Sequence, residues 1–454
     1  MEFIARLRRL WQFRGFRRLL VVRIAAQIAD GVTQMGIVSY ALFSPQRQAN
    51  AWAVTGVLAI TLLPFSVIGP FTGVLLDRWP RQRMVMVTES IRLAVCLAIA
   101  GVIWGTSGTG SAGIAATYVL VLVALSFNRF LLSGLGAGLA DVVPEKAYLD
   151  ASSVMPMLGP IGLLSGGIIA GAIRLGVGDA DHANAIIFCA AAACCCATVV
   201  FNTRIGRLEL GPVVDGGYVR PKSGGPGQIL RGLAQGYAYL RKQAPVTQGL
   251  WAISVEHVMY GVVMTCMIMA YRNYFHSSND PNSAIVDIGI WSLASGVGFA
   301  LSGVVAPSIA HRIGIRKAVM VLLLASAIVQ AVPGSIFFRP TLVITALIAG
   351  VCIQSIKVCA DALTQIYIVD EFRGRVFALY DMLNNVTLVL GALIAALVAP
   401  AHGLSLPVFL GVAVVLAIQW ALFARLSRPW AADPRAAGSA LEPRAPSPAP
   451  MSAD

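Results

Sequence analysis

The chain carries little charge for its length. Of its 454 residues, 12% are Asp, Glu, Lys or Arg and 57% are hydrophobic, whereas soluble domains are roughly 25% charged and about 45–50% apolar. Its mean hydropathy is +0.76. This composition excludes a soluble enzyme, a secreted disulfide scaffold and a nucleic-acid-binding protein, even though the formal net charge is +13. It predicts a polytopic membrane protein.

Motifs for cofactors and metals are also missing. The sequence has no GxxxxGK[ST] nucleotide-binding loop, and its five His residues show no metal-ligand spacing. All eight Cys residues fall in apolar segments without a CxxC pair, which favours small buried side chains over disulfides or zinc ligands. We therefore expect no enzyme activity, no cofactor and no bound metal. Any active transport would draw on an ion or solute gradient.

Long apolar runs fill most of the chain. A helix needs about 20 apolar residues to cross a hydrocarbon core about 30 Å thick. Gly, Pro and charge clusters separate the runs. The sequence thus predicts an all-α membrane protein with twelve transmembrane helices, near 19–43, 52–76, 84–104, 114–140, 151–173, 184–203, 248–271, 285–310, 318–337, 341–366, 376–400 and 406–425.

The basic residues are distributed unevenly over the loops. With these spans, 25 of the 34 Lys and Arg fall on one side with both termini, 4 on the opposite side and 5 within spans. This positive-inside bias predicts cytoplasmic termini. Because the first span is long and contains Asp30, we do not expect a cleaved signal peptide.

The spans divide into two groups of six. The longest polar stretch, rich in Gly, Pro, Arg and Lys, separates them, and a Pro-, Ala- and Ser-rich tail that cannot bury a core follows the last span. The predicted domains are an N-terminal six-helix bundle (1–203), a central cytoplasmic loop (204–247), a C-terminal six-helix bundle (248–425) and a disordered cytoplasmic tail (426–454).

The two halves resemble each other at their cytoplasmic loops. GVLLDRWPRQR (73–83) follows the second span and PSIAHRIGIRK (307–317) follows the eighth, while VVPE (142–145) and IVDE (368–371) follow the fourth and tenth. Both pairs occupy equivalent places, so the repeat is parallel, six plus six. In transporters such repeats point to a central site at the repeat interface.

The first of these loops resembles the signature of the major facilitator superfamily, Gly-x-x-x-Asp-Arg-x-Gly-Arg-basic. Gly73, Asp77, Arg78 and Arg81 match it, while Pro80 replaces the second Gly. The wider segments GPFTGVLLDRWPRQRMVMVTESIRL and RGRVFALYDMLNN are most similar to the macrolide-efflux and siderophore-export branch. The resemblance covers residues 17–425 and implies the major facilitator fold.

The loop charges suggest a cytoplasmic latch. Asp77 can accept hydrogen bonds at a neighbouring helix N-terminus, and Arg81 can bridge to Asp141 after the fourth span, with Asp381 as a further partner. Gly73 belongs to the same signature. The alternative is that these charges only mark the membrane surface.

Asp30 is the sharpest candidate for a proton site, because ionisable residues within spans are costly and usually functional. It lies roughly 17 Å into the first helix, with Gln27 and Gln34 on the same face. Burial favours the protonated form of a carboxyl group. The alternative is a structural hydrogen bond to a neighbouring helix.

Arg129 in the fourth span is the expected counter-charge of Asp30, in a run (RFLLSGLGAG, 129–138) that resembles the drug-antiporter motif of that helix. A structural pairing with an acid explains Arg129 about as well. The glycines and proline of the fifth span partly resemble the exporter motif, although generic helix packing accounts for them nearly as well.

The second half offers further polar residues. Glu256, nearer the cytoplasm, is either a proton site or a snorkelling acid, whereas Lys357 and Asp361 can pair at i, i+4. Glu89 and Arg92 read as a local salt bridge near the cytoplasmic end of the third helix. The proton-coupling candidates are thus Asp30, Arg129 and Glu256, and the substrate-cavity candidates are Gln27, Gln34, Tyr260, Gln354, Lys357, Asp361, Asn384 and Asn385.

These features predict a secondary active transporter of a bacterial inner membrane, working by alternating access as a proton-coupled exporter of amphipathic small molecules. Its expected partners are that substrate, protons and the lipid bilayer, with no nucleic acid. The sequence does not give the oligomeric state, although this fold is commonly sufficient as a monomer. Metabolite uptake, facilitated diffusion and lipid translocation remain alternatives. A non-transporting membrane scaffold or sensor is the alternative from another class.

Overall fold

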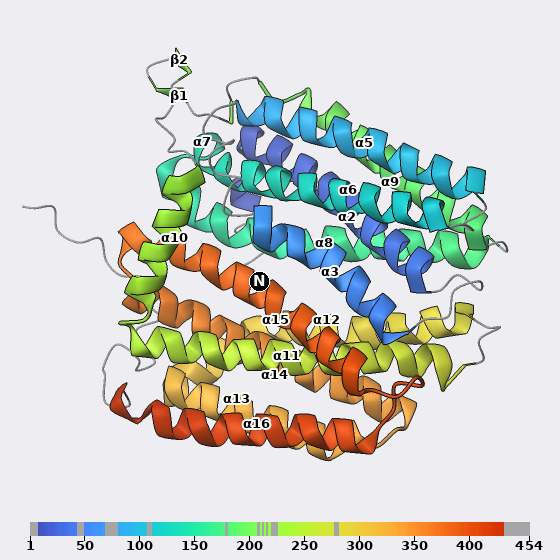
Figure 1. Ribbon diagram of the computed structural model, residues 1–454. Coiled ribbons are helices and arrows are strands. Elements are labelled where there is room, and N and C mark those ends of the chain that lie inside the picture. Colours follow the sequence, from blue (N-terminus) through green and yellow to red (C-terminus); the bar gives the residue numbers. More distant parts are fainter. Residues whose placement is uncertain are drawn as a thin grey trace, which may run out of the picture. The chain divides into compact units, whose positions relative to one another are not determined.

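The computed structural model describes residues 8–42, 50–68, 80–106, 111–177, 180–206, 209–210, 213–214, 217–218, 226–276 and 281–430. These residues are almost entirely helical (Figure 1). The described helices of the first half are α2 (Arg14–Leu42), α3 (Ala51–Ile68), α5 (Arg81–Thr106), α6 (Ser111–Ala137), α7 (Leu139–Val142), α8 (Glu145–Gly176) and α9 (Ala180–Asn202).

The helices that follow begin with one short amphipathic segment. The rest are long and apolar, except for two 3₁₀ turns. They are α10 (Pro226–Leu240), α11 (Ala244–Asn273), α12 (Pro281–Ile313), α13 (Ile315–Ala331), η2 (Pro333–Ser335), α14 (Arg339–Tyr367), α15 (Asp370–Val398), α16 (Leu406–Leu426) and η3 (Arg428–Trp430).

The predicted all-α class is confirmed. Each predicted span overlaps one long helix. Nine helical segments of the described residues are long and apolar enough to cross a membrane. The helix α2 is also long, but Gln27, Asp30 and Gln34 interrupt its apolar sequence. The count of twelve crossings remains a prediction.

The predicted central loop, 204–247, contains regular structure. Strand β1 (Val213–Val214) pairs antiparallel with β2 (Gly217–Tyr218), and α10 occupies most of the second part of the stretch. Of the predicted tail, Leu426 ends α16 and η3 follows directly, while 431–454 lie outside the described residues.

The chain divides into two compact units. The first comprises Met1–Arg231 with Ile268–Ile285, and the second comprises Gly232–Met267 with Val286–Asp454. The end of α11 and the start of α12 thus group with the first unit, a division that differs there from the predicted bundles.

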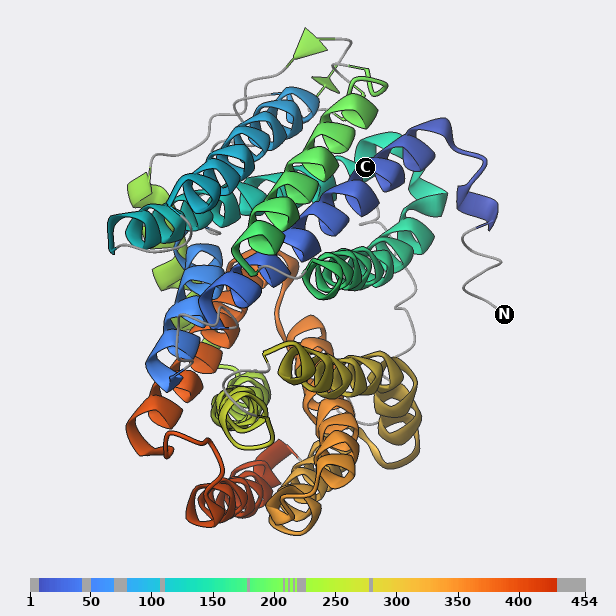
Figure 2. The same ribbon diagram turned by 90° about the vertical axis from the view of Figure 1, so that its right-hand side faces the viewer.

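Within the first unit, α2 packs along α8 and α9, and α5 packs along α6 and α9. In the second unit α13 lies between α14 and α16, and Figures 1 and 2 both show α13 and α16 side by side. Each unit has its own apolar core. Phe16 and Leu131 belong to the first, and Leu323, Ile356 and Phe423 to the second.

Large apolar side chains also cover the outside of the helices. Ile168 and Val304 are each 69% exposed, and Leu397 is 67% exposed. Exposure of so much apolar surface to water is unfavourable, whereas exposure to lipid tails is not.

Two of the cysteines expected to be buried, Cys189 and Cys196 on α9, are exposed as well, and all eight are free.

Glycine pairs set the closest helix crossings. A methyl group on Gly31 of α2 would overlap the carbonyl oxygen of Leu163 on α8, and one on Gly166 would overlap that of Ile28. In the second unit, Gly261 of α11 approaches Leu388 of α15 in the same manner. Because these pairs join the first and fifth predicted spans of each half, the contact follows the six-plus-six repeat.

Gly166→Ala is expected to destabilise the protein by about 1–3 kcal/mol, the usual cost of overpacking, because backbone rather than a flexible side chain meets the new methyl group. Gly167 is the matched control, since a Cβ there meets nothing within 4 Å. Thermal unfolding of the two purified variants measures the difference. Equal melting temperatures would contradict this account of the crossing.

Candidate functional site

Asp30 lies inside the first unit, on α2, and is 3% exposed. The Gln34 side chain donates a hydrogen bond of 2.8 Å from Nε2 to Asp30 Oδ2. The other carboxylate oxygen, Oδ1, lies 3.5 Å from Nη2 of Arg92 on α5. Asp30 therefore joins two helices through a buried ion pair.

Arg92 is shared between two acids. Its Nη1 donates to Glu89 Oε1 at 2.7 Å and to Asn128 Oδ1, on α6, at 3.2 Å. The side chains of Arg92 and Glu89 are fully buried, and that of Asp30 is 5% exposed. One guanidinium thus faces two carboxyl groups away from water, in a cluster that we call the Asp30 cluster (Asp30, Gln34, Glu89, Arg92 and Asn128).

This geometry corrects the expected place of Arg92 and shows a partner of Asp30. The predicted Glu89–Arg92 salt bridge exists, but Arg92 lies roughly 17 Å from the start of α5, near its middle, rather than at its cytoplasmic end. The structure adds a partner of Asp30 that the sequence did not single out, Arg92. Arg129 belongs to α6, and its side chain lies outside the described part of the chain.

Gln27 takes a different direction from Gln34. Its side chain packs on α8, where a Cβ on Gly159 would lie 3.0 Å from Gln27 Nε2 and one on Gly162 would lie 2.8 Å from Gln27 Cβ. The predicted polar stripe therefore divides, since Gln34 bonds Asp30 and Gln27 fills a glycine-lined position on α8. The α8 glycines serve close packing here.

Glu256 is the main buried acid of the second unit. It lies near the middle of α11, is 2% exposed, and accepts a hydrogen bond of 3.3 Å from the Ser326 hydroxyl of α13. Among the described residues it forms no ion pair. The Glu256 side chain is buried within its unit, which contradicts the snorkelling interpretation, whereas the expected place nearer the cytoplasm stays a prediction.

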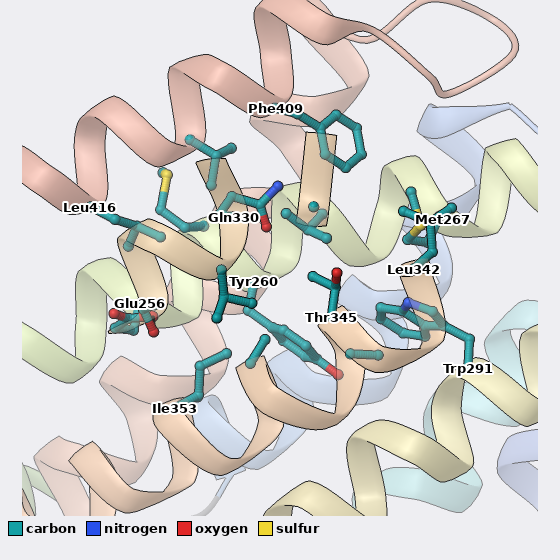
Figure 3. Close-up of a pocket in the computed structure, with 18 residues that line it drawn as sticks. Glu256, Tyr260, Met267, Trp291, Gln330, Leu342, Thr345, Ile353, Phe409 and Leu416 are labelled. Atoms are coloured by element: carbon teal, nitrogen blue, oxygen red, sulfur yellow. Dashed lines mark hydrogen bonds between the residues drawn. The ribbon is translucent and has the colours of Figure 1, made fainter. Parts of the chain in front are cut away.

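A cavity of about 40 Å³ adjoins Glu256. In Figure 3 the Glu256 carboxyl lies at one end and the Trp291 indole at the other, with Tyr260, Gln330 and Thr345 between them in this view. The Tyr260 hydroxyl and the Ser295 hydroxyl are 3.0 Å apart. This volume holds roughly two or three water molecules, far less than the about 300–1,000 Å³ of a typical ligand pocket.

Lys357 and Asp361 form the predicted i, i+4 pair on α14. Lys357 Nζ lies 3.1 Å from Asp361 Oδ2, and each side chain is 28% exposed. The ammonium also lies 5.1 Å from the ring centroid of Tyr380 on α15. Of the neighbouring candidates, Asn384 is buried, while Asn385 and Gln354 are half-buried.

The residues expected to form the latch are described only in part. Gly73 and Asp77 lie outside the described residues, and of Asp141 only the backbone, in α7, is described. Arg81 donates a hydrogen bond of 3.0 Å to the Leu210 carbonyl within its own unit. Asp381 is an exposed residue of α15.

Sequence reasoning missed Asn128 and Ser326. Asn128 is a buried amide one position before Arg129. Ser326 lies four residues before Gln330 on α13, and Ser326 and Gln330 both line the cavity. A polar i, i+4 pair within an apolar span, such as Ser326 and Gln330, is a signal in the sequence that could have predicted these buried polar residues.

Among the described residues, no group of three or more His, Cys, Asp or Glu could hold a metal ion.

Known proteins resemble the chain over most of its length. No family model matches it. An uncharacterised MFS-type transporter of Mycobacterium bovis is 32% identical over 411 residues, which cover 88% of this chain and 89% of that protein. An uncharacterised MFS-type transporter of Mycobacterium tuberculosis matches to the same extent.

Solved structures show the same fold. The nucleoside transporter NupG superposes with a TM-score of 0.65 at 13% identity, covering 91% of this chain and 99% of its own. A peptide transporter POT in complex with sulfate superposes with a TM-score of 0.67 at 15% identity, covering 92% and 95%. Relatives and structural neighbours are transporters, not enzymes. The chain belongs to the MFS-type transporters, as the loop at 73–83 indicated.

Proposed function

We propose that this transporter is a proton-coupled exporter of amphipathic small molecules that works by alternating access. The observation that carries the proposal is the Asp30 cluster, in which two buried carboxyl groups share one guanidinium. Ionisable groups buried in a membrane protein are costly, which makes a cluster of three of them a functional candidate. The efflux branch and the cytoplasmic latch suggested by the sequence belong to the same proposal.

Asp30 is the group that exchanges the proton. Arg92 can neutralise one carboxylate, and its 2.7 Å bond to Glu89 is shorter than its 3.5 Å contact with Asp30. Asp30 is therefore the less tightly held acid. Protonation of Asp30 releases Arg92 to Glu89 alone, so the contact between α2 and α5 weakens and the two helices can shift.

Glu256 is proposed as a second proton site, in the other unit. An isolated buried carboxylate is costly without a counter-charge, and Glu256 has only the Ser326 hydroxyl as a polar partner among the described residues. The adjoining cavity has room for the few waters that would carry a proton to it.

The substrate would contact residues that combine apolar surface with few polar anchors, including Tyr260, Lys357 and Asn384. The Lys357–Asp361 pair satisfies its own charge, so it offers a substrate little net attraction. Apolar burial, at about 25 cal/mol per Å², then supplies most of the affinity. Such a site binds bulky amphipathic molecules with broad specificity.

Transport into inside-out vesicles tests this function. An inward-acid proton gradient is expected to drive uptake of fluorescent amphipathic dyes, and chemically unrelated hydrophobic drugs should compete for it at one site. The control is the same vesicles with the gradient dissipated. A single tight sugar or amino-acid ligand that amphipaths do not displace would instead indicate metabolite uptake, and lipid flipping without dye transport would indicate a lipid translocator. The absence of any transported compound would favour a scaffold or sensor.

A further inference from the structure

The short helix α10 has three different sides. The first side packs on the second unit, where Gly236 and Leu240 are buried. The Tyr239 ring stacks on Phe372 with 4.6 Å between centroids and an interplanar angle of 6°. Arg375 of α15 donates a hydrogen bond of 3.2 Å to the Gln235 side chain. This side fixes α10 to the first turns of α15.

The second side is apolar and exposed. Leu230 is 58% exposed and Tyr237 is 54% exposed, and they lie seven residues apart, on one face of the helix. Ala234, between them, is exposed as well. The Arg241 guanidinium lies 5.9 Å from the Tyr237 ring centroid and closes the stripe at its C-terminal end. We call Leu230, Ala234 and Tyr237 the apolar stripe.

The third side is basic. Arg231 and Lys242 are both exposed and lie eleven residues apart, about three helical turns. The surrounding sequence adds to this charge, because residues 216–255 contain no Asp or Glu and five basic residues, which are Arg220, Lys222, Arg231, Arg241 and Lys242. No acid of this stretch can neutralise them.

We propose that α10 lies on the membrane surface and binds the anionic headgroups of lipids, with its apolar stripe in the headgroup–acyl boundary. A helix with an apolar face of Leu and Tyr beside Lys and Arg has the chemistry of an interfacial helix. Each Lys or Arg near an anionic leaflet contributes about 1 kcal/mol.

The position of α10 supports a lipid surface over a protein partner. Only residues 241–243 separate α10 from α11, which is long and apolar enough to cross the membrane, so α10 is tethered where that helix starts. Figure 1 shows α10 running across the direction of α11 and α15 rather than along it. Membrane lipid is therefore available to the apolar stripe at all times, and binding would anchor the start of α15.

Spin labels in the full-length protein test this placement. Cys189, Cys194 and Cys196 are first replaced by Ser, because they are the cysteines that are not buried. A label is then placed at Ala234→Cys, in the apolar stripe, or at the exposed Gln228→Cys on another face. In phosphatidylcholine vesicles containing phosphatidylglycerol, the label at 234 should collide with oxygen more than with a water-soluble nickel chelate. The label at 228 should show the reverse.

The charge is tested by Arg231→Gln, Arg241→Gln and Lys242→Gln together. Losing three such charges, at about 1 kcal/mol each, should weaken phosphatidylglycerol-dependent insertion of the label at 234 roughly hundredfold. The matched control replaces the exposed Arg312, Lys317 and Arg428 of the second unit with Gln, and it should leave insertion unchanged.

Three outcomes would overturn the proposal. The label at 234 could stay as accessible to nickel as the label at 228. It could be inaccessible to both reagents in every vesicle, which would show that protein covers the stripe. The control variant could weaken insertion as much as the α10 variant, which would show a general effect of net charge. None of these readouts depends on a transported substrate, so this proposal and the proposed function can fail separately.

Discussion

Asp30→Asn is expected to abolish proton-driven accumulation of substrate while substrate exchange down its gradient remains. Asn keeps the size of Asp and can still bond Gln34 and Arg92, but it cannot exchange a proton. Accumulation by the variant in proteoliposomes should fall to that of vesicles without protein. Counterflow, which needs no net proton movement, should persist in the same vesicles.

The control for Asp30 is Asp30→Glu, which restores a carboxyl group one methylene further out. Partial recovery of accumulation would tie the loss to the proton rather than to packing. Undiminished accumulation in Asp30→Asn would show that Asp30 is not the coupling group. Loss of accumulation in Glu256→Gln alone would then assign the coupling to Glu256.

Arg92→Met is expected to cause the largest loss of stability, about 3–5 kcal/mol, the usual cost of breaking a buried ion pair from one side. The substitution leaves the Glu89 and Asp30 carboxyl groups close together without a positive charge between them. Water does not reach this place, since the Arg92 and Glu89 side chains are fully buried. Thermal unfolding in detergent, followed by the yield of monodisperse protein, measures the loss.

Two further variants separate charge from packing at this position. Arg92→Lys keeps one positive charge but loses the forked geometry that reaches Glu89 and Asn128 together, so its melting temperature should be intermediate. The triple variant Asp30→Asn, Glu89→Gln, Arg92→Met removes every charge, and replacing a whole buried cluster by neutral groups is often tolerated. It should recover most of the stability. A triple variant no more stable than Arg92→Met would contradict the electrostatic explanation.

The pairings that the sequence predicted correctly are local ones. Lys357 with Asp361 and Glu89 with Arg92 lie within one turn of a single helix, so helical periodicity alone places their side chains together. The fold class is similarly accessible, because a run of about 20 apolar residues has few alternatives to a membrane helix.

The sequence did not predict which side chains of different helices contact each other. The structure pairs Asp30 with Arg92, which the sequence had not singled out as its partner, while the side chain of the expected partner Arg129 lies outside the described residues. Hydropathy gives the extent of a span but not its rotation about its own axis, and one residue turns a side chain by about 100°. Two Arg residues in two apolar helices are therefore equivalent candidates until the helices pack.

The sequence alone determined that this is a helical MFS-type membrane protein with a parallel repeat, since hydropathy, charge bias and the loop at 73–83 are properties of the chain itself. Only the tertiary structure decided which buried charges meet, where Glu256 finds Ser326 beside a cavity, and how closely Gly31 and Gly166 let α2 and α8 approach. The physical reason is that these features depend on the rotation and offset of packed helices. Because lipid tails are as apolar as the side chains that they touch, they do not favour one rotation of a helix over another. The packing of small residues and the buried polar contacts determine that rotation.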